Sequence, residues 1–315
     1  MPSFTVFKGQ KGGKVYKSET TKPELRGDQV LVRITASGLC GTDLHYREND
    51  QVMGHEGVGI VETTGSDVTH FQKGDRVGWG YQHDSCGYCQ QCLRGNETYC
   101  ADRAMYGLAD FDQGSCASHA VWREAFLFKV PDGLSDEAAA PLMCGGATVF
   151  NALHAYHVEP TETVGIMGVG GLGHIAIQFA AKMGCYVVVL SGSERKKDEA
   201  LGLGAKEFIA MKNVKELQPS RLLDRLLVTT SAQPEWEKIV PALAPGATVH
   251  PISFLDGGNF SFPYSKSTII VVTHRVCTNI SISATSPQRD RCPRLSCRIE
   301  IYSQSHAGVC GAAQD

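Results

Sequence analysis

Hydrophobic and polar positions follow one pattern in the first part of the chain and another in the second. Residues 28–80 place short apolar stretches between glycines, as in DQVLVRITASG and GHEGVGIVETTG. Apolar residues at every second position, with glycine at the turns, predict antiparallel strands. Similar strands are expected over 118–130. The first part of the chain therefore predicts an antiparallel β domain.

From about Pro141 onward, apolar strands alternate with amphipathic helices. TVGIMGVG and CYVVVLSG are typical of strands, whereas LGHIAIQFAAKMG and SERKKDEALGLG are typical of helices. This β-α-β-α order predicts a doubly wound parallel sheet. The predicted fold class is α/β, with one domain over 1–150 and a second over 151–275. Residues 276–315 follow neither period, and we interpret them as a divergent segment returning to the first domain.

Composition excludes several classes of protein. The chain has 315 residues, of which 42% are hydrophobic and 20% charged, enough for two ordinary cores. A formal net charge of −3 provides no basic field for nucleic acid or an anionic membrane. No apolar run approaches the ~20 residues of a membrane-spanning helix, and the opening residues lack the apolar centre of a signal peptide. We expect a cytoplasmic protein that binds neither nucleic acid nor membranes.

Four of the twelve cysteines lie in one segment with the spacing C-x2-C-x2-C-x7-C. They are Cys86, Cys89, Cys92 and Cys100. Tetrahedral zinc takes four thiolates, and gaps of two residues let a tight loop direct neighbouring sulfurs to one ion. Gly87 and Gly95 suit the turns of such a loop. The spacing predicts a structural zinc site over 86–100, with an iron–sulfur cluster or four separate thiols as alternatives.

A glycine-rich turn follows the first predicted strand of the α/β domain. Val164–Ile166 leads into GVGGLG, and a helical pattern begins at once. In this context the glycines permit a tight turn, a close approach to pyrophosphate and close packing of helix on strand. The helix N-terminus also offers free N–H groups to phosphate oxygens. The turn predicts dinucleotide binding by Gly168, Gly170, Gly171, Leu172 and Gly173.

The end of the next strand indicates which dinucleotide binds. A site for NAD places an acidic residue there to bind the ribose 2′-hydroxyl. The strand YVVVL instead runs into hydroxyl and cationic residues, which suit a 2′-phosphate. Glu194, in the same stretch, favours NAD instead. The alternative interpretation is that these polar residues are only the solvated start of the next helix. We predict NADP(H), contacted by Ser191, Ser193, Arg195 and Lys196.

Three further residues have the chemistry of a catalytic zinc site, which takes about three protein ligands and keeps one position open. Cys40, His55 and Cys144 could supply two thiolates and one imidazole. Taken singly, each is more typical of a buried core thiol or a structural histidine. The presence of a four-cysteine segment and a nucleotide-binding pattern in the same chain favours the metal interpretation.

Six motifs in one order resemble a known family. They are CGTDLH, GHEGVGIV, GDRVGW, the four-cysteine segment, PLMCGGATV and GVGGLG, and they extend over about residues 5–275. The pattern resembles the zinc-dependent medium-chain alcohol dehydrogenases, and most of all their cinnamyl-alcohol-dehydrogenase-like, NADP(H)-using branch. The resemblance implies a GroES-like β domain, a Rossmann domain and an active site in the cleft between them. It also implies a homodimer with two zinc ions per chain, one catalytic and one structural.

The same resemblance assigns metal-binding roles. It implies catalytic zinc on Cys40, His55 and Cys144. Glu56 corresponds to an acidic residue that can lie beside or coordinate that metal. Asp43 corresponds to the acid that holds the zinc-bound histidine, and such partners fix the tautomer and basicity of a ligand.

The implied reaction is the transfer of hydride between NADP(H) and an aldehyde or alcohol, with zinc polarising the substrate oxygen. Thr42 corresponds to the hydroxyl residue that binds the substrate oxygen. His45 corresponds to the end of a proton relay, and histidine is the side chain that most readily exchanges a proton near neutral pH. Thr148 corresponds to a residue near the nicotinamide.

The chain departs from this family at two places. Tyr46–Gly54 is a short stretch where relatives carry a longer loop, which suggests a more open pocket for a bulky substrate. Trp79 and Tyr81 are candidates for lining that pocket, with core packing as the alternative. Residues 276–315 do not match the expected closing strands. These departures leave a non-redox enzyme (an isomerase, cyclase or lyase) on the same scaffold as the alternative function, and a catalytically silent binding protein as a third.

Overall fold

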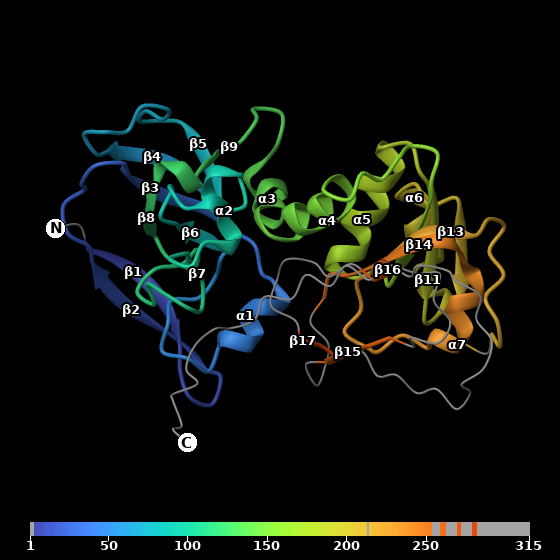
Figure 1. Cartoon of the computed structure of the whole chain (residues 1–315). Coiled ribbons are helices and arrows are strands. Elements are labelled where there is room, and N and C mark those ends of the chain that lie inside the picture. The colour runs from blue at the N-terminus through green and yellow to red at the C-terminus, as the bar shows by residue number, and fades with distance from the viewer. Residues whose placement is uncertain (1–2, 213, 254–258, 263–269, 272–278, 282–315) are drawn as a thin grey trace, which may run out of the picture. The chain divides into compact units, whose positions relative to one another are not determined.

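The computed structural model describes residues 3–212, 214–253, 259–262, 270–271 and 279–281. The chain divides into two compact units, Met1–Ala147 and Thr148–Asp315 (Figure 1). The segment 276–315, interpreted above as a divergent return to the first domain, lies outside the described residues except for Asn279–Ser281.

An antiparallel sheet forms the centre of the first unit. Its described strands follow the order β8-β3-β4-β5-β9, with bounds Gln29–Ser37 for β3, Gly57–Thr64 for β4, Arg76–Trp79 for β5, His119–Arg123 for β8 and Phe128–Lys129 for β9. The alternating valines of β3 pack with Trp79 and Trp122 in one apolar cluster. The antiparallel β domain expected from the period of two is confirmed. Trp79 is fully buried and belongs to this core.

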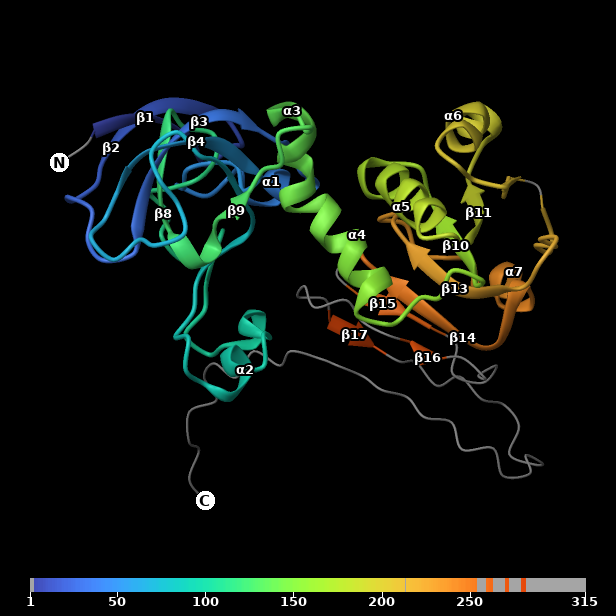
Figure 2. The same cartoon turned by 90° about the horizontal axis from the view of Figure 1, so that it is seen from above.

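Shorter elements surround this sheet. β1 (Ser3–Gly9) pairs with β2 (Val15–Thr21), and β6 (Gln82–Asp84) pairs with β7 (Ala104–Met105). The short helices are α1 (Gly41–Tyr46), α2 (Gln90–Leu93) and α3 (Asp136–Ala139), with 3-10 turns at Glu97–Tyr99, Glu124–Phe126 and Ala140–Met143. β6 and β7 form the base of the segment that carries α2, and Figure 2 shows this segment extending away from the sheet.

A parallel sheet forms the centre of the second unit. Its described strands follow the order β12-β11-β10-β13-β14-β16, and every neighbouring pair is parallel. The bounds are Thr163–Met167 for β10, Tyr186–Ser191 for β11, Glu207–Ala210 for β12, Leu223–Val228 for β13, Leu243–Pro251 for β14 and Ile270–Val271 for β16. The chain starts at the centre of this sheet and winds outward in both directions, as in a Rossmann fold. The predicted doubly wound sheet is confirmed.

Helices accompany these strands in the predicted alternation. They are α4 (Gly145–His154), α5 (Gly171–Lys182), α6 (Lys197–Gly202) and α7 (Trp236–Ile239), with 3-10 turns at Glu194–Lys196 and Val240–Ala242. α5 packs on β10 and β11, and α6 packs on β12. Every residue of β10 is buried, as expected for a parallel strand covered on both faces. β15 (Asn259–Ser261) and β17 (Asn279–Ser281) form a separate parallel pair.

Among the described residues, no helix combines the length and apolar character needed to cross a lipid bilayer.

Candidate functional site

The residues proposed above as catalytic zinc ligands lie together in the first unit. Cys40 immediately precedes α1, the adjacent pair His55 and Glu56 precedes β4, and Cys144 precedes α4. One possible ligand atom of each residue lies within 4.8 Å of those of the other three. We call Cys40, His55, Glu56 and Cys144 the buried cluster. The tertiary fold assembles it from three separate stretches of chain.

One carboxylate organises two members of the buried cluster. Asp43 accepts the backbone N–H of Cys40 on one oxygen and the Nδ1–H of His55 on the other, each at 2.9 Å. Asp43 is 1% exposed. Burial alone would raise the pKa of its carboxyl, but the bonds from His55 and Cys40 outweigh burial and lower it. Asp43 therefore stays ionised and holds both ligands in place.

The second ring nitrogen of His55, Nε2, does not bond to Asp43. Because Nδ1 donates to Asp43, Nε2 carries a lone pair in the neutral form of the ring, which is the form that binds a metal. Nε2 is fully buried and has no hydrogen-bond partner among the described residues. A buried polar atom left unpaired is costly, and such an atom calls for an explanation such as a bound ion. A metal ion bound by the neighbouring sulfurs would supply the missing partner.

Charge within the buried cluster also fits a cation. A hydrogen bond from the Cys144 thiol, aided by His55, lowers the pKa of Cys40 to about 4 despite burial. The resulting thiolate raises the pKa of Cys144, and burial beside it raises the pKa of Glu56 to about 7. Ionisation of Cys40 thus disfavours ionisation of Cys144 and Glu56. A divalent cation would relieve that competition, and two thiolates with an imidazole suit zinc.

A glycine makes room for the carboxyl of the buried cluster. A Cβ atom on Gly38 would lie 2.0 Å from Oε2 of Glu56, so any larger residue would displace that side chain. No local pattern in the sequence distinguishes Gly38 from the turn glycines nearby.

The other residues assigned by resemblance lie on two helices. Asp43, Thr42 and His45 are all on α1, where Thr42 is half-buried and His45 is exposed. Thr148 is half-buried on α4, at the start of the second unit. Tyr81 belongs to the surroundings of the buried cluster, because its ring meets that of His55 edge-on at 5.4 Å.

The four cysteines of residues 86–100, here called the cysteine lobe, form a second cluster in the first unit. Ligand atoms of Cys86, Cys89, Cys92 and Cys100 lie within 4.8 Å of one another. The positive φ angles of Gly87 and Gly95, 78° and 69°, turn the chain between them. Backbone N–H groups point at two of the sulfurs, from Cys86 to Cys100 at 3.4 Å and from Cys89 to Cys86 at 3.3 Å. Main-chain donors of this kind can bond to sulfurs that also ligate a metal ion.

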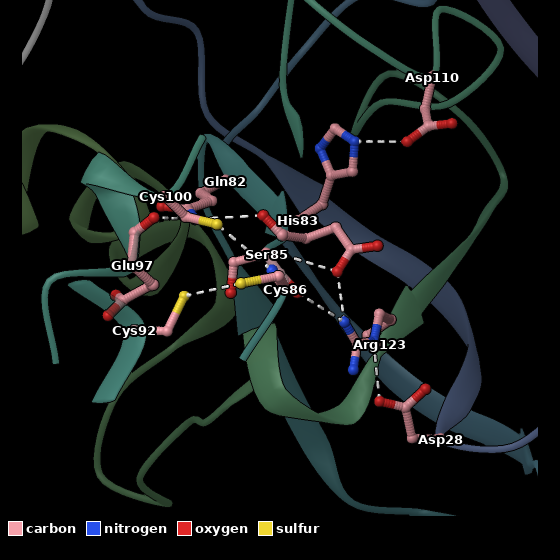
Figure 3. Close-up of polar contacts among 11 residues, drawn as sticks. Asp28, Gln82, His83, Ser85, Cys86, Cys92, Glu97, Cys100, Asp110 and Arg123 are labelled. Atoms are coloured by element: carbon pink, nitrogen blue, oxygen red, sulfur yellow. Dashed lines mark hydrogen bonds and ion pairs between the residues drawn. The ribbon is translucent and has the colours of Figure 1, made fainter. Parts of the chain in front are cut away.

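Polar contacts attach the cysteine lobe to the sheet (Figure 3). Arg123 on β8 forms ion pairs with Asp84 and with Asp28, the latter at 2.8 Å, and also bonds to the carbonyl of Ser85. Gln82 donates to the carbonyl of Glu97 at 3.1 Å and so joins the two ends of the lobe. The lobe is therefore held by its own main chain and by the side chains of Gln82 and Arg123.

The glycine turn of the second unit has an open surface and a tight base. Gly168 has a φ of +99°, and a Cβ on Gly173 would lie 2.0 Å from the carbonyl oxygen of Gly168. By contrast, a Cβ on Gly170 or Gly171 would meet nothing within 4 Å. α5 starts at Gly171, so its N-terminal N–H groups face this free space. The turn has room and donors for a pyrophosphate.

A cavity of about 500 Å³ lies at the carboxyl ends of the strands beside this turn, and Gly168, Leu190 and Gly192 contribute to its wall. Among the predicted cofactor contacts near it, Lys196 donates to the carbonyl of Val169 at 2.5 Å, which places a cation against the glycine turn. Ser191 ends β11, and Ser193 and Arg195 are exposed after it. The cavity also has five polar residues that no motif in the sequence indicated: Lys212, Thr230, Gln233, Glu235 and Lys238. Lys212 lies just after the carboxyl end of β12. Ligands of open parallel sheets bind beyond the carboxyl ends of the strands, so this is where a cofactor contact is expected.

Comparison with known proteins agrees with both units. The alcohol dehydrogenase GroES-like domain matches residues 26–132, and the zinc-binding dehydrogenase domain matches residues 171–291. Probable cinnamyl alcohol dehydrogenase 8A from Oryza sativa subsp. japonica is 34% identical over 259 residues, covering 73% of this chain and 72% of that protein. This chain belongs to the zinc-dependent medium-chain alcohol dehydrogenase family, in its cinnamyl-alcohol-dehydrogenase-like branch.

Solved structures show the same fold. A cinnamyl alcohol dehydrogenase from Sorghum bicolor has a TM-score of 0.79 at 29% identity, covering 88% of this chain and 84% of that one. The Helicobacter pylori cinnamyl alcohol dehydrogenase, solved in complex with NADP(H), has a TM-score of 0.74 at 25% identity and coverages of 80% and 76%. Against two other curated dehydrogenases, the chain spans only 57% and 63% of the relative's length.

Proposed function

We propose that this protein is a zinc-dependent oxidoreductase that transfers hydride between NADP(H) and an aldehyde or alcohol. The observation that carries the proposal is the buried Nε2 of His55, which has no partner among the described residues, on a ring that offers a ligand atom within 4.8 Å of the sulfurs of Cys40 and Cys144. Membership of a dehydrogenase family and a Rossmann turn with room for pyrophosphate support it. No observation on the described residues favours the non-redox alternative.

Cys40, His55 and Cys144 would hold the catalytic zinc, with Glu56 beside them as a further or alternate ligand. Zinc bound there supplies a Lewis acid that polarises a substrate oxygen. Asp43 keeps the Nε2 lone pair of His55 directed at the metal position, because it accepts the Nδ1–H. The cysteine lobe would hold a second, structural zinc.

Thr42 and His45 would move the proton of the reaction. A hydroxyl on α1 next to Cys40 can donate a hydrogen bond to the substrate oxygen, and the exposed His45 can exchange that proton with solvent. Gly170, Gly171 and the first N–H groups of α5 would bind the pyrophosphate. Hydride chemistry belongs to the cofactor, and the protein contributes position and charge.

The preference for NADP(H) would come from the residues that follow β11. Arg195 is exposed there, and Ser191 and Ser193 offer hydroxyls where a site for NAD has an acid. Lys196 keeps a second positive charge at the glycine turn through its bond to Val169. Cytoplasmic location and a homodimer remain predictions that accompany this function.

The test of the activity is NADPH oxidation with a panel of aromatic and aliphatic aldehydes. We expect turnover by the zinc-loaded protein and its loss in Cys40→Ser. Cys185→Ser is the matched control, because that thiol lies in the second unit and contacts only the carbonyl of Glu159 among the bonds described. NADPH binding without oxidation of any aldehyde by the zinc-loaded protein would contradict the proposal.

The test of the cofactor preference compares the dissociation constants of NADPH and NADH. Arg195→Ala should weaken NADPH binding roughly tenfold or more with little effect on NADH, as for loss of a charged hydrogen bond. Lys197→Ala is the control, since Lys197 pairs with Glu194 at 3.6 Å. Equal effects of Arg195→Ala on the two cofactors would overturn the assignment of Arg195.

A further inference from the structure

Two tyrosines enclose the ring of His55. Tyr106 lies at a centroid distance of 4.9 Å with an interplanar angle of 32°, and Tyr81 meets the ring edge-on at 5.4 Å. Tyr81 immediately precedes β6, Tyr106 immediately follows β7, and the Tyr106 N–H donates to the carbonyl of Tyr81 at 2.9 Å. The chain between them is the cysteine lobe with its two short strands. Both tyrosines therefore stand at the base of the lobe and against a ligand of the buried cluster.

Tyr106 also holds the backbone that carries His55. Its hydroxyl accepts the N–H of Gly54 at 3.1 Å, and Tyr106 is 5% exposed. Gly54 has a φ of +88°, and a Cβ there would lie 2.4 Å from Oγ of Ser115. The carbonyl of Gly54 also accepts the Ser115 N–H at 2.8 Å, so packing and hydrogen bonds on both polar atoms of Gly54 confine the turn before His55. The ring and the hydroxyl of Tyr106 together fix the side chain and the main chain of a single ligand.

The cysteine lobe in turn determines where Tyr106 lies. β6 and β7 are only a few residues long, and a hairpin of that size is unstable alone. Closure of the lobe around a metal ion, with the Gln82 bond to Glu97, would hold the two strands together. The lobe lies upstream of Tyr106 in the chain and contributes no atom to the buried cluster.

We propose that Tyr106 is a positioning residue for the metal ligand His55, and that the cysteine lobe holds Tyr106 in place. The lobe would then contribute to metal retention at the buried cluster as well as to stability. This inference rests on the proposed function for the presence of a metal, but it concerns how firmly the metal is held and not the turnover of a substrate.

The experiment measures metal release. In the full chain, cobalt is exchanged into the buried cluster while zinc stays in the lobe, and its loss to a chelator is followed by the sulfur-to-cobalt absorption band. Tyr106→Phe keeps the ring and removes the acceptor of the Gly54 N–H, and we expect release about tenfold faster than in the wild type. Tyr106→Leu, which also removes the ring, should release cobalt faster still.

Tyr46→Phe is the matched control. Its hydroxyl bonds to that of Tyr81 at 3.1 Å and its ring meets Tyr106 edge-on at 5.5 Å, but it does not contact the Gly54 N–H. We expect wild-type cobalt release from this variant and retention of lobe zinc in all three. Unchanged release from folded Tyr106→Phe, or equal loss of metal from both sites, would overturn the positioning role. If Tyr106→Leu does not fold, Tyr106→Phe decides alone.

A double-mutant cycle tests the link to the lobe. Cys92→Ser removes one lobe sulfur and should also accelerate cobalt release, and adding Tyr106→Phe should then have a smaller effect than in the wild type. Additive effects would break the proposed link. Cobalt held firmly by a protein that reduces no aldehyde would disprove the proposed oxidoreductase and leave this inference intact. Failure of the wild type to bind cobalt at the buried cluster would disprove both.

Discussion

The cysteine lobe and the buried cluster both gather four possible metal ligands within 4.8 Å, but they are built in different ways. All four lobe sulfurs come from one continuous segment, and three of the four cysteines are half-buried. The buried cluster takes its members from three stretches, and two of its residues, His55 and Glu56, are buried. The geometry of the lobe site depends on the conformation of a single loop. The geometry of the buried cluster depends on the packing of every element that carries one of its ligands.

The two sites also differ in what holds their ligands: mainly main-chain groups in the lobe, and side chains in the buried cluster. Main-chain N–H groups approach two sulfurs of the lobe, and Gly87 and Gly95 turn the chain between the cysteines. Around the buried cluster, side chains hold the ligands: Asp43 bonds to Cys40 and His55, and the ring of Tyr106 packs on that of His55. Single substitutions away from the ligands should therefore weaken the buried cluster and leave the lobe intact.

The largest effect is expected from Cys144→Ser. This change removes one of the two sulfurs of the buried cluster, so zinc content should fall from about two ions per chain to about one. Turnover should fall about 10³-fold or more, because the polarising metal is lost. Elemental analysis and NADPH oxidation measure the two outcomes. A variant that keeps both ions and normal turnover would remove Cys144 from the site.

Cys100→Ser should act on stability. Cys100 is fully buried in the lobe, and loss of its sulfur should release the lobe metal and lower the free energy of unfolding by about 4 kcal/mol. Urea denaturation with zinc analysis measures this, and Cys116→Ser is the control, since Cys116 belongs to neither cluster. Unchanged stability with loss of one zinc would mean that the lobe metal is not structural.

Asp43→Asn should weaken metal binding at the buried cluster roughly 10-fold to 100-fold. The amide can no longer accept from both Cys40 and His55 as a carboxylate does, so the His55 ring loses its fixed orientation. A competition titration with a zinc chelator measures the affinity. Asp50→Asn, which removes an exposed carboxylate bound to Lys8 and Tyr16, should change nothing. Weakening of the lobe site by Asp43→Asn would contradict the separation of the two sites.

The smallest effect is expected at Asp136, whose bonds to Thr35 and Arg76 we call the clamp on α3, the helix that precedes Cys144. Asp136 at the start of α3 accepts the Thr35 hydroxyl at 2.5 Å and pairs with Arg76 at 2.6 Å. The hydrogen bond from Thr35 lowers the pKa of Asp136. Burial raises this pKa, but the ion pair with Arg76 adds to the lowering, so the net shift is downward. A carboxyl with a lower pKa in the folded chain stabilises the fold above about pH 3.9 and loses that contribution as pH falls through its folded pKa.

Asp136→Asn should therefore lower the free energy of unfolding by about 1 kcal/mol near pH 6, a modest value because both partners are partly exposed. The difference from the wild type should shrink as pH falls below about 4. Urea denaturation of the two metal-free proteins at several pH values measures it. A difference that stays constant with pH would show that the ionised carboxylate is not what stabilises the clamp.

Residue spacing was enough to predict the elements whose interactions are local. The glycine turn before α5, the strand and helix order of the second unit and the four-cysteine lobe all depend on residues close together in sequence. The antiparallel sheet followed from the period of two in β3 and β4. The positions of Gly38 and Tyr106 could not be found this way, because each acts on a residue distant in the chain, Glu56 in one case and His55 in the other.

The sequence by itself determined the two-part α/β architecture, the family and the kinds of ligand available, because periodicity, glycine placement and motif order are written along the chain. Only the tertiary structure decided which side chains meet. Whether Cys40, His55 and Cys144 share one position depends on how α1, the turn at Gly54 and the turn before α4 pack on the sheet. That packing is a sum of many contacts between distant residues, and no local pattern specifies it.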